Sequence, residues 1–268
     1  MKLLFILIPL ISFSSFVFSQ EKTEDKREVK IVAHRGASRF APENTIAAFL
    51  KAAEMGADYV EMDVRQTKDG HFIIMHDRTV NRTTNGMGLV SEMELDEIQK
   101  LEAGAHFSEK FSGEKVPTLS EALEAIKGKI LPDIDFKDGN AEELVKILEE
   151  EGCLENGDVT LYSGWKNIKA VMEHTDKLLF RPSSKSGETG LDELIEKIDP
   201  PIVNISKSNF SEFYMREVHR QGKLAFVNAL RRADNKKFMK RALEAGCDFL
   251  QADKLDVLIP LVKEHNLK

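Results

Sequence analysis

The sequence contains very little cysteine. Only Cys153 and Cys247 occur among its 268 residues, which is too few for a disulfide framework, and their spacing is not that of metal-binding cysteines. We therefore expect two buried free thiols, with a single long-range disulfide as the alternative.

Basic runs are missing as well. The chain has 38 Lys and Arg residues against 45 Asp and Glu residues, which are interspersed and give a formal net charge of −7. The absence of a basic stripe or polybasic tail argues against binding to nucleic acid or to an anionic membrane surface. With 42% hydrophobic and 31% charged residues, the composition is that of a globular protein and excludes disordered, collagen-like and low-complexity chains.

The N-terminal 19 residues differ from the rest. Lys2 gives a basic start, and residues 3–18 are apolar apart from a few serines, a run shorter than the ~20 residues of a membrane-spanning helix. Val17 and Ser19 are the small residues that a signal peptidase requires before its cut. We predict a signal peptide at 1–19, a charged linker at 20–29 and an exported protein, periplasmic or secreted, with no stable membrane insertion after cleavage. A permanent membrane anchor is the alternative.

Strand-like and helix-like stretches alternate along residues 30–268, which we expect to form one domain. The strand-like runs begin near Ile31, Asp58, Leu131, Val159, Lys177, Pro201, Lys223 and Cys247. Alternation of this kind implies parallel strands joined by right-handed crossovers. Eight such units predict an α/β fold, a closed (β/α)₈ TIM-type barrel. A doubly wound open sheet is the alternative.

One interval is far longer than the others, because 73 residues separate Asp58 from Leu131. It contains an apolar run at 71–75 behind the turn sequence Lys68-Asp69-Gly70, which predicts an antiparallel β-hairpin arm. The following segment, at about 78–117, is predicted to be a small insertion at the catalytic rim.

Acidic residues occur where the second and third barrel strands are predicted. Glu61 and Asp63 share one face of a strand, and so do Asp133 and Asp135, because side chains alternate along a strand. Carboxylates that face a barrel interior repel one another unless a cation joins them. Glu61, Asp63 and Asp135 therefore predict a site for Mg²⁺ or Ca²⁺, which prefer oxygen ligands. The alternative is that these carboxylates face outward and pair with Lys or Arg.

The hairpin brings a histidine back toward these carboxylates. If the turn is centred on Lys68 and Asp69, the pairing places His76 opposite Glu61, with the two Cβ atoms ~5 Å apart. A bulge would shift this register by one residue.

His34 and Arg35 end the first predicted strand, and Lys137 ends the third. Together with His76 and a cation they suit phosphodiester cleavage. One histidine removes a proton from the nucleophile and the other protonates the leaving alkoxide. The metal ion, Arg35 and Lys137 stabilise charge on the phosphoryl oxygens.

Several motifs in order along the chain resemble those of the glycerophosphodiester phosphodiesterase family. They are Ile31-Val32-Ala33-His34-Arg35-Gly36, Pro42-Glu43-Asn44-Thr45, Glu61-x-Asp63, Lys68-Asp69-Gly70, His76-Asp77 and Arg82-Thr83-Thr84-Asn85-Gly86. The resemblance implies a barrel and metal-dependent hydrolysis of glycerophosphodiesters to glycerol 3-phosphate and an alcohol. It implies His34 and His76 as the acid–base pair and Glu61 and Asp63 as metal ligands. In that family a substrate hydroxyl attacks phosphorus and water opens the cyclic phosphate, which would make His34 the base and His76 the acid.

Some positions depart from the family pattern. Its usual Glu-x-Lys is Asp135-Phe136-Lys137 here, so the metal preference could differ, and its Trp-Thr-Val-Asn is Ala225-Phe226-Val227-Asn228. We expect Arg35, Lys137, Glu43 and Phe226 to contact a small-molecule phosphodiester, although Glu43 could instead complement the start of a helix. Two other functions stay open: a phospholipase-type phosphodiesterase for inositol or choline phospholipids, and a non-catalytic phosphate-ester binding protein.

Overall fold

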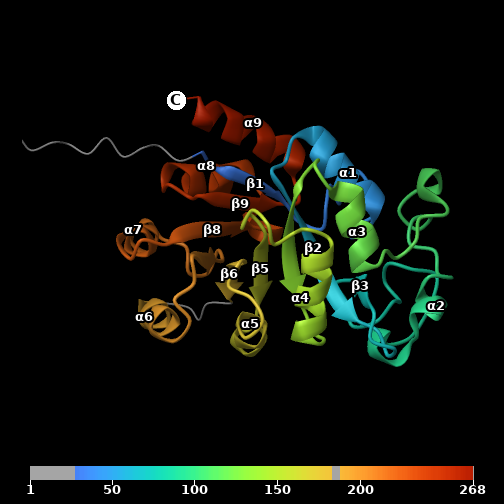
Figure 1. Ribbon diagram of the computed structural model, residues 1–268. Coiled ribbons are helices and arrows are strands. Elements are labelled where there is room, and N and C mark those ends of the chain that lie inside the picture. The colour runs from blue at the N-terminus through green and yellow to red at the C-terminus, as the bar shows by residue number, and fades with distance from the viewer. Residues whose placement is uncertain (1–27, 183–187, 268) are drawn as a thin grey trace, which may run out of the picture.

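The computed structural model of the protein describes residues 28–182 and 188–267 (Figure 1). The predicted signal peptide at 1–19 and most of the predicted linker at 20–29 lie outside these residues. No helix in the described part of the chain combines the length and the apolar character needed to cross a membrane.

Eight parallel strands form a nearly closed barrel, in the order β6-β5-β4-β2-β1-β9-β8-β7. The strands are β1 (Lys30–Ala33), β2 (Tyr59–Gln66), β4 (Leu131–Phe136), β5 (Thr160–Ser163), β6 (Leu179–Pro182), β7 (Ile202–Ile205), β8 (Leu224–Ala229) and β9 (Phe249–Ala252). Within the described residues, β6 and β7 form the seam and share no backbone ladder. The predicted TIM-type barrel is confirmed.

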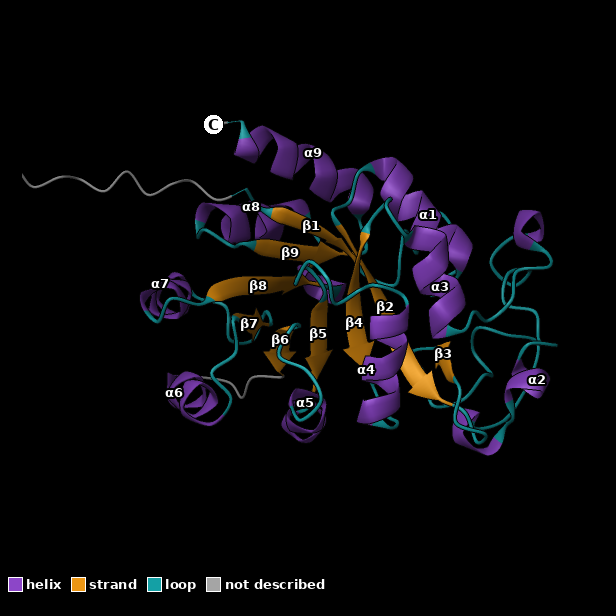
Figure 2. Ribbon diagram, viewed as in Figure 1, coloured by secondary structure: helices purple, strands orange, loops and turns teal. Residues whose placement is uncertain are grey.

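Helices cover the outside of the barrel (Figure 2). They are α1 (Ile46–Met55), α3 (Leu119–Ile126), α4 (Ala141–Glu150), α5 (Trp165–Met172), α6 (Glu188–Lys197), α7 (Glu212–Arg220), α8 (Lys236–Glu244) and α9 (Leu255–Asn266). The main hydrophobic core lies between these helices and the strands. Both cysteines are free: Cys247 is buried and Cys153 is half-buried.

The alternation of side chains along β2 separates the core from the site. Val60, Met62 and Val64 are in the main core cluster, whereas Tyr59 belongs to a smaller apolar cluster with Phe226 and other inward residues. Glu61 and Asp63 alternate with the core residues and so lie on the same side of the strand as Tyr59. The barrel interior is therefore apolar at the start of β2 and acidic toward its end.

The hairpin arm is β3 (Phe72–Ile74), which pairs antiparallel with the end of β2. The predicted register is wrong by one residue, because Gln66 pairs with Phe72 rather than with His71. The cause is a turn that is one residue longer than expected: the Thr67 N–H donates to the His71 carbonyl at 2.8 Å, and Gly70 has φ +90°. His76 lies beyond β3, so the strand pairing does not fix its side chain.

The segment between β3 and α3 forms a small unit beside the barrel, on the right in Figure 2. It contains α2 (Leu95–Ile98) and two short 3₁₀ turns, Val90–Glu92 and Glu109–Phe111. Its own buried cluster consists of Ile73, Met75, Val80, Val90, Ile98, Ala103 and Val116. Because Ile73 and Met75 come from the hairpin arm, this cluster holds the insertion against the barrel rim.

Gly36 allows the chain to turn from β1 into the loop before α1. Its φ is +79°, and a Cβ at this position would lie 2.7 Å from the Cβ of Ala48. Only glycine combines this conformation with so close an approach. Since His34 and Arg35 immediately precede it, Gly36 sets where these two residues leave the barrel.

We predict that Gly36→Ala lowers the free energy of unfolding by about 3 kcal/mol, because it adds a clash to an unfavourable φ. Gly128→Ala is the matched control, since Gly128 has φ +70° but no atom within 4 Å of the added Cβ. Its expected loss is about 1 kcal/mol. Urea unfolding of both variants measures the difference, and equal losses would contradict the steric role of Gly36.

Candidate active site

A cavity of about 300 Å³ opens at the C-terminal ends of the barrel strands. Its lining consists of His34, Arg35, Glu61, Asp63, His76, Asp135, Lys137, Tyr162, Arg181, Asn228, Leu230, Arg231, Gln251 and Asp253. The cavity thus brings together both predicted catalytic histidines, the three predicted metal ligands, Arg35 and Lys137. Catalytic residues of TIM barrels occupy this end of the strands.

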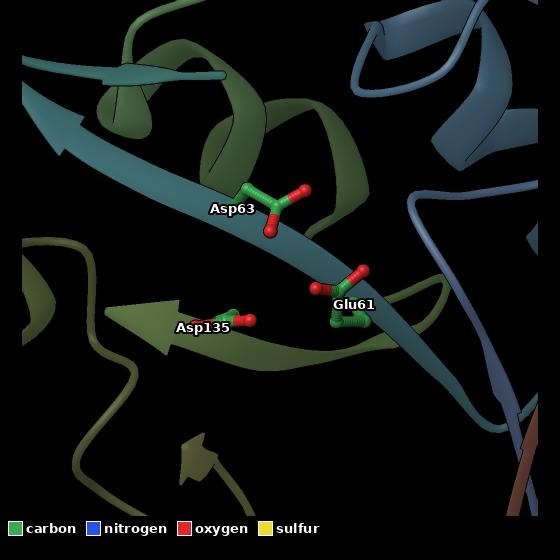
Figure 3. Close-up of side chains that lie close together, drawn as sticks. All are labelled: Glu61, Asp63 and Asp135. Atoms are coloured by element: carbon green, nitrogen blue, oxygen red, sulfur yellow. The ribbon is translucent and has the colours of Figure 1, made fainter. Parts of the chain in front are cut away.

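Three carboxylates converge in the cavity. Glu61 and Asp63 project from β2 and Asp135 from the neighbouring β4 (Figure 3), and one oxygen of each lies within 4.8 Å of the others. Burial and the charges of Asp63 and Asp135 raise the pKa of Glu61 well above its ordinary value. Burial likewise raises the pKa of Asp135. Each of the three carboxylates makes ionisation of the others less favourable. A hard divalent cation, which prefers oxygen ligands, suits such a cluster.

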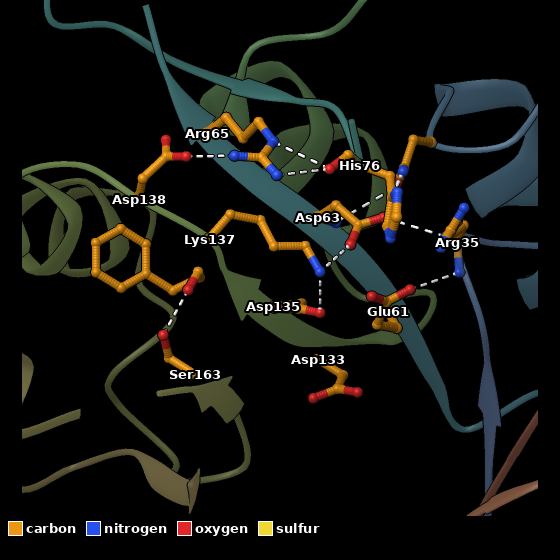
Figure 4. Close-up of polar contacts among 12 residues, drawn as sticks. Arg35, Glu61, Asp63, Arg65, His76, Asp133, Asp135, Lys137, Asp138 and Ser163 are labelled. Carbon is orange, nitrogen blue, oxygen red and sulfur yellow. Dashed lines mark hydrogen bonds and ion pairs between the residues drawn. The ribbon is translucent and has the colours of Figure 1, made fainter. Parts of the chain in front are cut away.

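Positive groups compensate part of this charge. The Nζ of Lys137 lies 2.8 Å from one oxygen of Asp63 and also bonds Asp135, and the Nε of Arg35 lies 3.3 Å from the other Asp63 oxygen (Figure 4). Although burial alone raises the pKa of Asp63, Lys137 and Arg35 hold it below its ordinary value. The Asn44 side chain donates to Asp63 at 2.7 Å and so fixes that carboxylate.

His34 is held by an aspartate from the opposite end of the sequence. Its Nδ1 lies 2.6 Å from Oδ1 of Asp253, which follows β9. Although burial alone raises the pKa of Asp253, the hydrogen bond and charge of His34 hold it below its ordinary value. With Nδ1 bonded to a carboxylate, Nε2 is the ring nitrogen left for a substrate.

His76 is held in a similar way. Its Nδ1 lies 2.6 Å from Oδ1 of Asp77, while Arg65 donates to the His76 carbonyl through Nε at 3.0 Å and through a terminal nitrogen at 2.8 Å (Figure 4). Arg65 also bonds Asp138, just beyond β4. These contacts bring His76 into the cavity although it lies outside the strand pairing.

Arg82, from the inserted segment, joins the two halves of the site. It donates to both oxygens of Glu43 at 2.8 Å and to those of Asp77 at 2.7 and 3.1 Å. Glu43 in turn accepts from Arg35 at 2.9 Å. The hydrogen bonds from Arg82 are the largest influence on the pKa of Asp77 and hold it well below its ordinary value. A continuous row of charged groups thus runs from Arg35 to His76.

Glu43 itself is not among the residues that line this cavity. Its carboxylate is occupied by Arg35 and Arg82, so it holds other site residues in place instead of complementing the start of α1.

The expectation for Phe226 is wrong. Its side chain is completely buried and is absent from the cavity lining. The Arg181 guanidinium lies over its ring, 3.6 Å from the centroid, and bonds both oxygens of Asp133 at 2.7 and 2.8 Å. Phe226 therefore supports a buried ion pair beneath the cavity. Its position inside an apolar barrel layer explains why a substrate contact is excluded.

Sequence reasoning did not assign roles to Asn44, Asp77, Arg82 or Asp253, although these residues hold Asp63, His76 and His34 in place. Asn44, Asp77 and Arg82 stand inside the motifs that carry the family resemblance, which is the signal that could have found them. Asp253 is 219 residues from His34, and only the closure of the barrel brings the two together.

Comparisons with known proteins agree with this geometry. Residues 34–257 match the glycerophosphoryl diester phosphodiesterase family. The curated glycerophosphodiester phosphodiesterase of Caldanaerobacter subterraneus subsp. tengcongensis is 35% identical over 252 residues, which cover 87% of this chain and 98% of that protein.

Solved structures show the same fold. The glycerophosphodiester phosphodiesterase from Agrobacterium tumefaciens is 28% identical, with a TM-score of 0.74 over 87% of this chain and 99% of that one. A phosphodiesterase from Oleispira antarctica, solved in complex with the product sn-glycerol-3-phosphate, is 24% identical, with a TM-score of 0.79 over 87% and 96%. The family match and the 35% identity extend over most of the chain, and this protein therefore belongs to the glycerophosphoryl diester phosphodiesterase family, a family of hydrolases.

Proposed function

We propose that the protein hydrolyses glycerophosphodiesters to glycerol 3-phosphate and an alcohol, with His34 and His76 as the acid–base pair. The observation that carries this proposal is the meeting of two histidines and three carboxylates at one cavity, each histidine held by an aspartate through Nδ1. Family membership supports the substrate class.

The histidines perform the two proton transfers. His34 removes a proton from the attacking hydroxyl of the substrate through Nε2, and His76 protonates the leaving oxygen through its own Nε2, which gives the free alcohol and a cyclic phosphate. Water then opens the cyclic phosphate, giving a proton to His76, while His34 returns its proton to the oxygen that leaves phosphorus. Asp253 and Asp77 orient the two rings and stabilise the protonated form of each, as a carboxylate does for a catalytic histidine.

Glu61, Asp63 and Asp135 would hold a divalent cation, Ca²⁺ or Mg²⁺. When bound, the ion supplies positive charge that stabilises the phosphoryl oxygens as the bond to phosphorus changes. Arg35 and Lys137 add fixed positive charge in the same cavity. Glu43 keeps the Arg35 guanidinium in place through its 2.9 Å contact.

We further propose that the protein is exported. The apolar N-terminal segment with its small residues Val17 and Ser19 supports a signal peptide at 1–19.

Activity should depend on both the metal and His76. We expect release of glycerol 3-phosphate from glycerophosphoethanolamine with Ca²⁺ or Mg²⁺, none after chelation, and a fall in kcat of at least about 100-fold in His76→Ala. His71→Ala, at an exposed histidine of the hairpin turn, is the control and should keep full activity. Full activity of His76→Ala would contradict the mechanism. Release from an intact phospholipid alone would favour the phospholipase-type alternative.

The metal site can be tested without turnover. Without added metal, Glu61→Gln should unfold a few degrees above the wild type at pH 7, since it removes one of three crowded carboxylates. Ca²⁺ or Mg²⁺ should raise the melting temperature of the wild type but not that of the variant. The exposed Glu54→Gln serves as control and should follow the wild type in both conditions. A metal-induced shift retained in Glu61→Gln would show that the ion binds elsewhere.

Arg82 should act through Asp77 on the orientation of His76. We expect Arg82→Ala and Asp77→Asn each to lower kcat about 10- to 100-fold, and the double variant to fall no further than Asp77→Asn, because all three groups form one network. Arg82→Lys should recover little, since an ammonium group cannot reproduce the forked contacts. Arg78→Ala, at an exposed arginine nearby, is the control. Steady-state kinetics measures kcat for each variant. If the losses of the two single variants add in the double variant, Arg82 does not act through Asp77.

A further inference from the structure

Arg231 has a backbone conformation that arginine seldom adopts. Of the described non-glycine residues, Arg35, Asn44, Asp199 and Arg231 have positive φ, and for Arg231 it is +54°. Arg35 and Asn44 both hold Asp63 in the active site. Arg231 lines the same cavity. Left-handed backbone at residues other than glycine persists where surrounding structure enforces it, and it concentrates at functional sites.

The turn that carries Arg231 is fixed from both sides. The Asp234 N–H donates to the Arg231 carbonyl at 3.1 Å, and the Ala233 N–H donates to the Leu230 carbonyl at 2.9 Å. The Asp234 side chain accepts from the backbone N–H of Lys254, just beyond β9, at 3.3 Å. Arg231 is therefore held at the cavity by an anchored turn that follows β8.

Arg231 also differs from the other cations of the cavity in its ion pairing. Arg35 pairs with Glu43 and Asp63, Lys137 with Asp63 and Asp135, and Arg181 with Asp133. Among the lining residues that the structure describes, Arg231 is the cationic side chain without an ion pair, and it is exposed. A positive charge is thus available for a ligand at the mouth of the cavity.

The same lining has no place for a cationic group. Among the described residues that line the cavity, Tyr162 is the one with an aromatic ring of the Phe, Tyr or Trp type. The Arg181 guanidinium already faces that ring, 4.9 Å from its centroid. Asp253 is bonded to His34, and the other lining carboxylates form the metal triad. A quaternary ammonium group binds through open aromatic faces or unpaired carboxylates, and the described lining has neither of them.

Since the glycerol 3-phosphate part is common to all substrates and must reach the buried triad, the variable alcohol extends toward the exposed mouth. We infer that Arg231 is a specificity-determining residue that favours glycerophosphodiesters whose leaving alcohol carries an anionic group. A guanidinium binds a carboxylate or phosphate through two parallel hydrogen bonds. This inference rests on the proposed function.

Glycerophosphoserine and glycerophosphoethanolamine test the inference, because their alcohols differ by one carboxylate. We expect the wild type with bound Ca²⁺ or Mg²⁺ to prefer glycerophosphoserine about tenfold in kcat/KM. Arg231→Gln should lower kcat/KM about tenfold for glycerophosphoserine and less than twofold for glycerophosphoethanolamine. Arg232→Gln makes the same charge change in the same turn outside the cavity lining, and it should leave both values unchanged.

Equal losses on both substrates in Arg231→Gln would overturn the inference, since they would indicate a contact with the shared phosphate or a structural role. A wild type without preference for glycerophosphoserine would overturn it as well, while leaving the proposed function intact. No glycerol 3-phosphate from either substrate would instead contradict the proposed function, and the charge preference with it. Equal thermal unfolding of the three proteins establishes that the comparison is made between folded enzymes.

Discussion

Mutual repulsion among Glu61, Asp63 and Asp135 is the constraint on which the rest of the site depends. These carboxylates are crowded where β2 and β4 pair side by side, and burial strengthens their interaction. The surrounding structure supplies compensation from several directions: Lys137 from the end of β4, Arg35 from the end of β1, and the Asn44 amide from the loop before α1. A bound divalent cation would neutralise the remaining negative charge of the three carboxylates.

The insertion is part of the site although it lies outside the barrel. Arg82 lies between Glu43 and Asp77 and bonds both, so the orientation of His76 depends on a segment whose own small core packs against the hairpin arm. Arg65 ties the His76 backbone to the barrel in the same region. The position of the histidine is thus determined by these side-chain contacts together with the hairpin, whose last hydrogen bond runs from the Met75 N–H to the Asp63 carbonyl at 2.8 Å.

The sequence was sufficient to predict the architecture and the two histidines and three carboxylates that meet at the cavity, because strand–helix alternation and residue type are local properties. The register of the hairpin was missed since it depends on a single backbone conformation, that of Gly70. The partnership of His34 with Asp253 could not be read from spacing, because the barrel must close before residues 219 positions apart meet. Phe226 was assigned to the substrate from its place in a family motif, which does not reveal depth inside the barrel, and Arg181 covers its ring.

Among the described residues, the seam between β6 and β7 is the one place where neighbouring barrel strands share no backbone ladder. Glu61 and Asp63 stand on β2 and Asp135 on β4, while His34 and Arg35 follow β1, and these three strands are joined by continuous backbone hydrogen bonds. The opposite wall of the cavity rises from strands beside the seam, where Arg181 reaches across to Asn204 at 2.7 Å. Since side chains rather than a backbone ladder join β6 to β7, substitutions at this junction can reshape the wall there while the ladders among β1, β2 and β4 stay intact. Under the proposed function, this wall can therefore change its fit to the alcohol while the groups proposed for catalysis keep their positions.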